Sequence, residues 1–163
     1  MGADHAGGPT YQIRPTGPSD IRRVEAGILN WGADMTYANN PYGVGLGRLV
    51  DLDSGAEFLA RQALSHIRDD GVRRRLVGVQ IDGARLEMNA IKWPVRLGAA
   101  RVGKVTTALY CPGLERNIGY AWVPVELAEP GTMLAVDTEA DGERPATVVP
   151  VPFIDPGKET AKA

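Results

Sequence analysis

The sequence contains very few of the residues that build disulfides and metal sites. Its 163 residues include one cysteine, Cys111, and two histidines, His5 and His66. A single cysteine excludes an internal disulfide and favours a reducing compartment, so we expect a cytoplasmic protein. These three residues match no usual spacing of metal ligands, and we therefore predict no metal site.

Long apolar runs and an excess of charge of one sign are also missing. The first ten residues show no apolar signal-peptide region, and no later run approaches the length of a membrane span, so we expect no membrane contact. Eighteen basic residues oppose 20 acidic ones, giving a formal net charge of −2. We therefore expect no nucleic-acid partner. Hydrophobic residues make up 44% of the chain, which is ordinary for one globular domain.

The first part of the chain predicts a helix after a flexible arm. Residues 1–16 are rich in Gly, Ala and Pro without periodicity, which is typical of a flexible arm. Ser19 or Asp20 is a helix N-cap, and apolar residues three and four apart then predict a helix over 21–31. Gly32 fits the position just after its end.

An ordered loop and a second helix are expected next. The loop is rich in Asn, Gly and Pro and is predicted to end in a short strand at 48–52. Ser54, followed three residues later by Glu57, forms a capping-box pattern that predicts a helix over 56–70. The apolar residues expected to form the buried face of this helix are Leu59, Ala63 and Ile67, flanked by Phe58 and Leu64.

The pattern changes after the second helix to short runs rich in Val, Thr, Ile and aromatic residues. Five or six such runs at close spacing predict a small antiparallel β-barrel over 73–155, and hence an α+β, mostly β fold. The Asp-Gly pairs at 82–83 and 141–142 predict hairpin turns. A polar tail is expected at 156–163.

Several segments match, in order, the motifs of one known family. They are RVEAG (23–27), WGADMTYANNPYGVGLGRLVDLD (31–53), AEFLARQAL (56–64), GKVTTALYCPGLERNIGYAWV (103–123), GTMLAV (131–136) and ATVVPVPF (146–153). This set resembles the aminomethyltransferase, or T-protein, family of the glycine cleavage system. The resemblance implies a T-protein C-terminal barrel, preceded at 17–72 by a segment that resembles the end of the folate-binding region.

The family enzymes are longer, and the resemblance covers only their C-terminal portion. It implies tetrahydrofolate as the cofactor, with most of the folate cleft and the aspartate that acts near the pterin in the missing N-terminal part. We therefore expect the C-terminal subunit or fragment of a tetrahydrofolate-dependent methyltransferase or aminomethyltransferase. A separate chain that resembles the N-terminal half would complete the site.

Two segments point to one branch of that family. GPSDIRRVEAGIL (17–29) and VVPVPFIDPGKE (148–159) resemble the dimethylsulfoniopropionate-demethylase-like branch. Members of this branch pass a methyl group to tetrahydrofolate. The resemblance therefore implies a demethylase-type reaction with a small-molecule methyl donor.

Four residues are candidates for contacting the cofactor, and three of them lie close together in the sequence. A tetrahydrofolate site needs a cation for the glutamate tail, a polar partner for the pterin nitrogens and an aromatic wall. Arg23, together with Arg22, is the candidate cation, Glu25 the polar partner and Trp31 the wall. Each has a structural alternative: an arginine paired with Asp20 or Glu25, a glutamate paired with Arg22 or solvated, and a tryptophan packed in the core.

Arg48 is the fourth candidate. The glycine-cleavage members of the resembling family usually carry a tryptophan at this position, and an arginine replaces a flat apolar surface with a fork of donors. Its side chain could bind an anionic substrate, pair with a carboxylate of a partner chain, or simply face water. Cys111 has no histidine near it in sequence, so we expect no nucleophilic role and no catalytic residue in this chain. The basic run 73–75 fits a solvated or domain-bridging cluster better than an anion site.

Two classes of function stay open. The first is the enzyme component, and the alternative is a free-standing non-catalytic binding or structural module. In either case the apolar face of the first predicted helix has too little preceding chain to cover it fully. We therefore expect association with a partner chain or with a second copy. The predicted interface contains this helix and the 33–47 loop and buries on the order of 1,000 Å².

Overall fold

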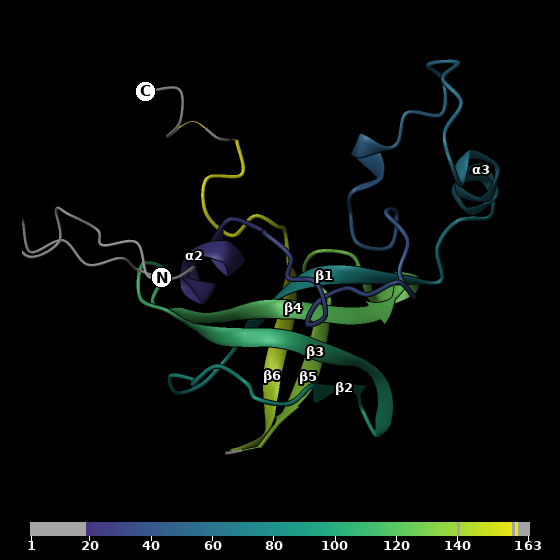
Figure 1. Ribbon diagram of the computed structural model, residues 1–163. Helices are drawn as coiled ribbons and strands as arrows, with labels where there is room; N and C mark the ends of the chain where they lie inside the picture. The colour runs from purple at the N-terminus through teal and green to yellow at the C-terminus, as the bar shows by residue number, and fades with distance from the viewer. Residues whose placement is uncertain (1–18, 140, 158, 160–163) are drawn as a thin grey trace, which may run out of the picture.

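The protein folds into a closed six-stranded antiparallel barrel, which confirms the predicted fold class (Figure 1). The structure is a computed structural model that describes residues 19–139, 141–157 and 159. Around the barrel the strands follow the order β1-β4-β3-β2-β5-β6. Their bounds are β1 Arg74–Ile81, β2 Trp93–Leu97, β3 Ala100–Cys111, β4 Arg116–Pro124, β5 Met133–Thr138 and β6 Gly142–Val149. The helices are α2 (Asp20–Glu25) and α3 (Arg61–Asp70), with short 3₁₀ turns at η1 (Gly47–Leu49) and η2 (Val125–Leu127).

The barrel core consists mainly of β-branched side chains. Val79, Val95, Val105, Val123 and Val136 have no exposed surface. Such side chains pack well on a pleated sheet and lose little rotamer freedom there. Their clustering explains why the β-rich runs of the sequence located most of the strands.

Two details of the strand prediction were wrong. The strand β2, with the sequence WPVRL, was not predicted. The Asp-Gly pair at 82–83 forms no hairpin, because β1 pairs with β4 and β6 rather than with the next strand. The predicted hairpin at 141–142 is confirmed, since β5 and β6 are neighbours and Thr138 pairs with Gly142.

The first helix is shorter than predicted, and the expected helix over 21–31 is wrong after Glu25. Ser19 is the N-cap, as predicted. The helix ends because Gly27, two residues after Glu25, adopts the left-handed conformation with φ of +74°. Gly32 also has a positive φ, of +88°, but it lies beyond the end of the helix. The barrel satisfies the carbonyl groups at the helix end: the Tyr120 hydroxyl donates to the Val24 oxygen at 3.1 Å.

The second helix begins at Arg61, five residues later than predicted. The capping box of Ser54 and Glu57 does not form, and Ala60 precedes the helix in the left-handed region with φ of +67°. The Arg61 side chain ties down the preceding segment through the carbonyl oxygens of Ala56 at 2.7 Å and Leu52 at 2.6 Å. The predicted strand at 48–52 is also wrong, since the 3₁₀ turn η1 occupies its start.

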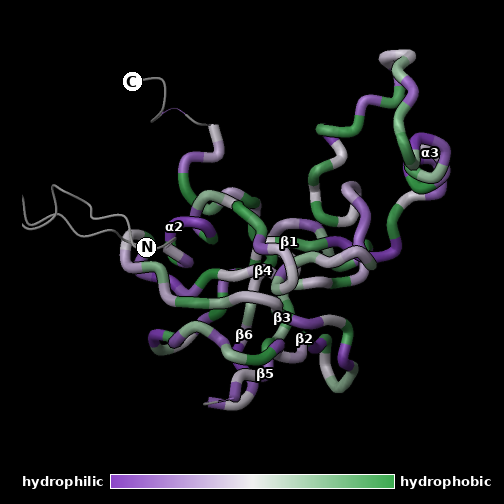
Figure 2. The backbone as a smooth tube through the Cα atoms, viewed as in Figure 1, coloured by the Kyte–Doolittle hydropathy of each residue, from purple (hydrophilic) through white to green (hydrophobic). Residues whose placement is uncertain are grey.

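Helix α3 stands away from the barrel on an extended arm (Figure 1). None of its residues is buried, so the predicted buried face is wrong, and Leu59 just before it is 96% exposed. Hydrophobic stretches are visible along this arm (Figure 2). In the part of the chain that the structure describes, no helix is long and apolar enough to cross a membrane.

Candidate functional site

A buried carboxylate, Asp34, fixes the loop after α2 against the barrel. Its side chain has no exposed surface. One carboxylate oxygen, Oδ1, accepts the hydroxyls of Thr106 at 2.8 Å and Thr107 at 2.7 Å. The other, Oδ2, accepts the Arg23 guanidinium at 2.9 Å and the Asn30 backbone N–H at 2.8 Å. A buried charge with partners on both oxygens meets the condition under which burial is tolerated.

A β-bulge in β3 makes this arrangement possible. In a regular strand, neighbouring side chains point to opposite faces of the sheet. The register between β3 and β4 shifts between Val105, which pairs with Ala121, and Thr107, which pairs with Tyr120, so Thr106 is an extra residue between these two pairs. The bulge re-aims one hydroxyl, and Thr106 and Thr107 therefore reach the same oxygen of Asp34.

Arg23, the predicted cofactor cation, lies beside Asp34. It also donates to Asp20 at 2.7 Å and to the Thr107 hydroxyl at 3.3 Å. Burial lowers the pKa of Arg23, but the hydrogen bond that Arg23 donates to Asp20 and the charge of Asp34 outweigh this effect, and the net shift is upward. The structural alternative of an arginine paired with Asp20 is thus present, although the tetrahydrofolate role of Arg23 stays a prediction.

Glu25, the predicted polar partner, accepts a hydrogen bond from the Cys111 thiol at 2.7 Å. This contact differs from both alternatives considered, the pair with Arg22 and the solvated position. Burial, followed by the hydrogen bond to Glu25, raises the pKa of the Cys111 thiol. A raised pKa lowers the thiolate fraction and makes the cysteine a poorer nucleophile.

The other two predicted contacts, Trp31 and Arg48, are exposed. Trp31 is 53% exposed, so core packing is wrong for it. Its ring lies edge-on to that of Tyr37, with centroids 4.6 Å apart. Arg48 lines a cavity of about 660 Å³ beside Gly27, between the loop, β1 and the chain after β6.

The four predicted residues therefore do not meet in one cavity. Arg48 lines the cavity beside Gly27 without Arg23, Glu25 or Trp31. The described residues alone do not fit a complete tetrahydrofolate site. Among these residues no group of three His, Cys, Asp or Glu side chains could hold a metal ion.

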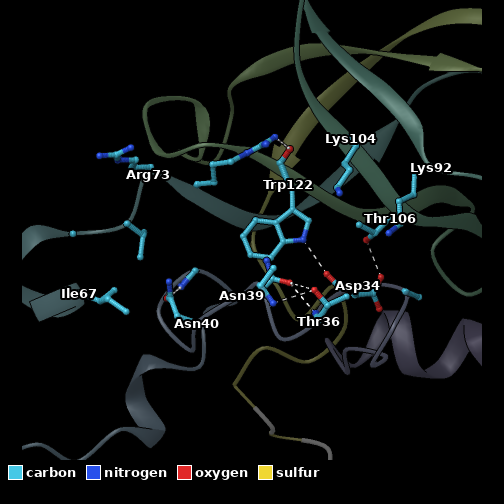
Figure 3. A pocket seen from close by; sticks show the side chains of 16 residues that line it. Asp34, Thr36, Asn39, Asn40, Ile67, Arg73, Lys92, Lys104, Thr106 and Trp122 are labelled. Atoms are coloured by element: carbon cyan, nitrogen blue, oxygen red, sulfur yellow. Dashed lines mark hydrogen bonds between the residues drawn. The ribbon is translucent and has the colours of Figure 1, made fainter. Parts of the chain in front are cut away.

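Trp122 of β4 connects the Asp34 centre to a second, smaller cavity of about 430 Å³ (Figure 3). Its indole N–H donates to the Asp34 backbone oxygen at 2.9 Å, which fixes the ring orientation. The residues around the ring come from the loop, the end of the α3 arm and strands β1 and β3. Four basic side chains line this cavity: Arg73, Arg74, Lys92 and Lys104.

Sequence reasoning missed Asp34, Thr106 and Trp122, although all three lie in segments quoted for the family resemblance. A signal was available in the Thr-Thr pair at 106–107, because two adjacent polar residues in a buried strand need a polar partner. The run 73–75 was read as a solvated or bridging cluster, and the structure places its first two residues at the cavity.

The comparisons with known proteins identify the family. Residues 74–155 match the family model described as the glycine cleavage T-protein C-terminal barrel domain. Aminomethyltransferases from Synechococcus sp. and Symbiobacterium thermophilum are 39% and 36% identical over 137 residues, which is 84% of this chain. The chain spans only 37% and 36% of their lengths.

A solved structure shows the same fold. The glycine cleavage system aminomethyltransferase T from Bartonella henselae superposes with a TM-score of 0.75 at 22% identity. The match covers 83% of this chain and 37% of that chain. On the sequence match of its barrel, the chain belongs to the glycine cleavage T-protein family.

Proposed function

We propose that this chain is the C-terminal component of a tetrahydrofolate-dependent one-carbon transferase. The observation that carries this is the extent of the similarity to aminomethyltransferases. It runs over 137 residues, whereas the barrel model covers 74–155. The similarity thus includes at least part of the segment before the barrel, which carries the Asp34 centre.

The cofactor site is proposed to be shared with another chain. Arg23 and Glu25 are held by internal contacts, while Trp31 and Tyr37 form an exposed aromatic pair beside them in the chain. Exposed aromatic side chains of this kind are typical anchors at interfaces. A docked surface would use this pair as a wall, with Arg48 supplying a charge from the neighbouring cavity.

The partner is proposed to be a separate chain that resembles the T-protein N-terminal half, with a second copy of this chain as the alternative. Ile28 is 58% exposed, Trp31 53% and Tyr37 96%, and all three lie on the predicted interface segment. Leaving such apolar groups in water costs about 1.5–3 kcal/mol for each large side chain that association would bury. This is a substantial drive to associate.

The reaction is proposed to be of the demethylase type, with a small-molecule methyl donor, on the resemblance of 17–29 and 148–159 to that branch. Aminomethyl transfer is the other possibility within the same family. The single cysteine fits a cytoplasmic location for either reaction.

A non-catalytic binding module is the second candidate. The observation in its favour is that Arg23 is paired with Asp34, while Cys111 donates to Glu25 and has a raised pKa, so none of the three is an activated nucleophile. Such a module would fold alone and bind its partner without turnover.

The deciding experiment mixes this chain with a separately produced N-terminal portion, either from a neighbouring gene or from the Synechococcus relative. We expect no tetrahydrofolate-dependent transfer by the chain alone. The mixture should form a complex by light scattering and produce one-carbon tetrahydrofolate from a methyl or aminomethyl donor.

Two variants sharpen this experiment. Trp31→Ala should weaken complex formation at least tenfold, whereas Leu97→Ala, which removes a 47% exposed apolar residue from the end of β2, should not. Robust turnover by the chain alone would contradict a shared site. A complex without turnover for any donor would support the binding module instead.

A further inference from the structure

The cavity beside Trp122 concentrates positive charge without neutralising it. Arg73 and Arg74 enter from the start of β1, Lys92 from the loop before β2, and Lys104 from β3. Lys104 pairs across the strands with Trp122, so the amine and the indole share one face of the sheet. Figure 3 shows Lys92 and Lys104 on one side of the indole and Arg73 on the other.

None of these four cations has a carboxylate within 4.0 Å in the described part of the chain. The acidic residue that lines the cavity is Asp34, and its oxygens are already taken by Arg23 and three other donors. Arg74 donates to the backbone oxygens of Val102 at 3.4 Å and Trp122 at 3.5 Å. These contacts position its guanidinium but leave its charge uncompensated.

The cations are close enough to affect one another. The pKa of Lys104 is lowered, first by burial and then by the charges of Lys92, Arg74 and Arg101. Like charges gathered in a partly desolvated place are unfavourable unless an anion joins them. An oxyanion in the cavity would relieve this repulsion.

Two amide side chains add donors to the same cavity. The Oδ1 atom of Asn39 accepts the Thr36 N–H at 2.8 Å, and that of Asn40 accepts the Gly43 N–H at 2.9 Å. Their oxygens are thus committed to the loop backbone. Neither amide NH₂ group has a hydrogen-bond partner among the described residues, so each is a free donor. Donors without acceptors suit an oxyanion.

We propose that this cavity binds a small oxyanion with two or more negative charges, held by Arg74, Lys92 and Lys104 over the Trp122 indole. Its volume of about 430 Å³ suits a small molecule. The net charge of −2 for the whole chain disfavours a nucleic acid as the ligand. Phosphate esters and polycarboxylates share the required chemistry.

Calorimetric titration of the whole chain with pyrophosphate, tricarballylate and acetate tests this proposal. Pyrophosphate or tricarballylate should bind at least tenfold more tightly than acetate at the same ionic strength. Tighter binding of pyrophosphate would identify a phosphate ligand, and tighter binding of tricarballylate a polycarboxylate, so either result supports the site. No preference over acetate would overturn it.

Variants locate the binding. Lys104→Met should reduce affinity at least tenfold, and Lys104→Arg should retain most of it because the charge stays. Arg116→Met, which removes one positive charge from the other end of β4, is the matched control and should change affinity less than twofold. Circular dichroism checks that each variant is folded. Equal losses in Lys104→Met and Arg116→Met would show nonspecific attraction and refute the assigned site.

Discussion

Replacing Asp34 by alanine should separate the loop after α2 from the barrel. Asp34 joins three parts of the chain: Arg23 of α2, the Asn30 backbone and the hydroxyls of Thr106 and Thr107 on β3. Alanine removes both carboxylate oxygens and leaves these donors without their acceptor.

The magnitude follows from what remains unpaired. Removing one partner of a buried ion pair typically costs about 3–5 kcal/mol, because the remaining charge is buried without compensation. Arg23 keeps its contact with Asp20 at 2.7 Å, and its side chain is 14% exposed. Part of its charge therefore stays compensated. We expect Asp34→Ala to lower the free energy of unfolding by about 3 kcal/mol, the lower end of that range.

Urea denaturation followed by indole fluorescence measures this loss. The Trp122 indole donates to the Asp34 backbone oxygen, so its emission reports on the junction. Amide hydrogen exchange provides the second measurement, and the Asn30 N–H should lose its protection first. Faster exchange confined to the loop would show local opening rather than global destabilisation.

Asp20→Asn is the matched control, because it removes the other carboxylate that Arg23 contacts. The Asp20 side chain is 44% exposed, and exposed pairs contribute about 0.2–1 kcal/mol. Asp34→Asn keeps the shape and should fall between the two. A loss below about 1 kcal/mol for Asp34→Ala, or one equal to that of Asp20→Asn, would refute the reasoning.

Three further predictions concern the surroundings of this junction. Gly32→Ala places alanine at φ of +88° with open space around the new Cβ and should lower the free energy of unfolding by about 1–2 kcal/mol. Gly27→Ala should cost more in the same urea titration, because its Cβ would lie 2.7 Å from Val151 Cγ1. Equal losses for the two variants would contradict a clash at Gly27. Burial raises the pKa of Tyr120 above its ordinary value of 10.0, so the contribution of the protonated phenol is complete below pH 10 and is lost as the pH rises further. The stability of Tyr120→Phe should therefore fall less between pH 9 and pH 11 than that of the wild type, and parallel pH profiles would argue against this. Cys111 is buried with a raised pKa, so iodoacetamide should label it at least tenfold more slowly in the native protein than in urea, and similar rates would show an accessible thiolate.

The barrel was predictable because its strands are signalled locally. Val-rich runs with turn residues between them identify half-buried strands without knowledge of their partners. The missed strand, β2, has five residues and contains Pro94, which weakens the signal. The order of the strands around the barrel was not predictable from local pattern, because β2 follows β1 in the sequence but lies between β3 and β5, away from β1.

The helices were predicted less well because their ends are set by tertiary contacts. Periodicity favoured continuation to Trp31, but the Val24 oxygen bonds Tyr120 and the Glu25 oxygen accepts the N–H groups of Phe153 and Ile154. These partners lie 96 to 129 positions away in the chain. The apolar residues of α3 are spaced at a helical period, but none of them is buried. The pattern therefore predicted that a helix forms, and predicted wrongly that one of its faces is buried.

The candidate site shows the same division between local and distant information. Arg23, Glu25 and Trp31 were found through a short motif, which reports residue type and order. Their states depend on Asp34 and Cys111, whose positions beside them follow from the closure of the barrel. Two of the three predicted contacts are consequently held in place by the chain itself, and the third is exposed.

This arrangement has a consequence for how a shared site would work. The buried Asp34 carboxylate is stable only when all its hydrogen-bond donors are in place, since a partly satisfied buried polar group is less favourable than an apolar one. The Asp34 centre therefore either holds the loop in one conformation or releases it as a unit. With the loop held, Trp31 and Tyr37 are presented in a fixed edge-on pair before any partner arrives. Less entropy is then lost on association, because the surface is already ordered. If a partner docks on this pair, variants of Asp34 should weaken its binding by disordering the pair, even though the Asp34 side chain has no exposed surface.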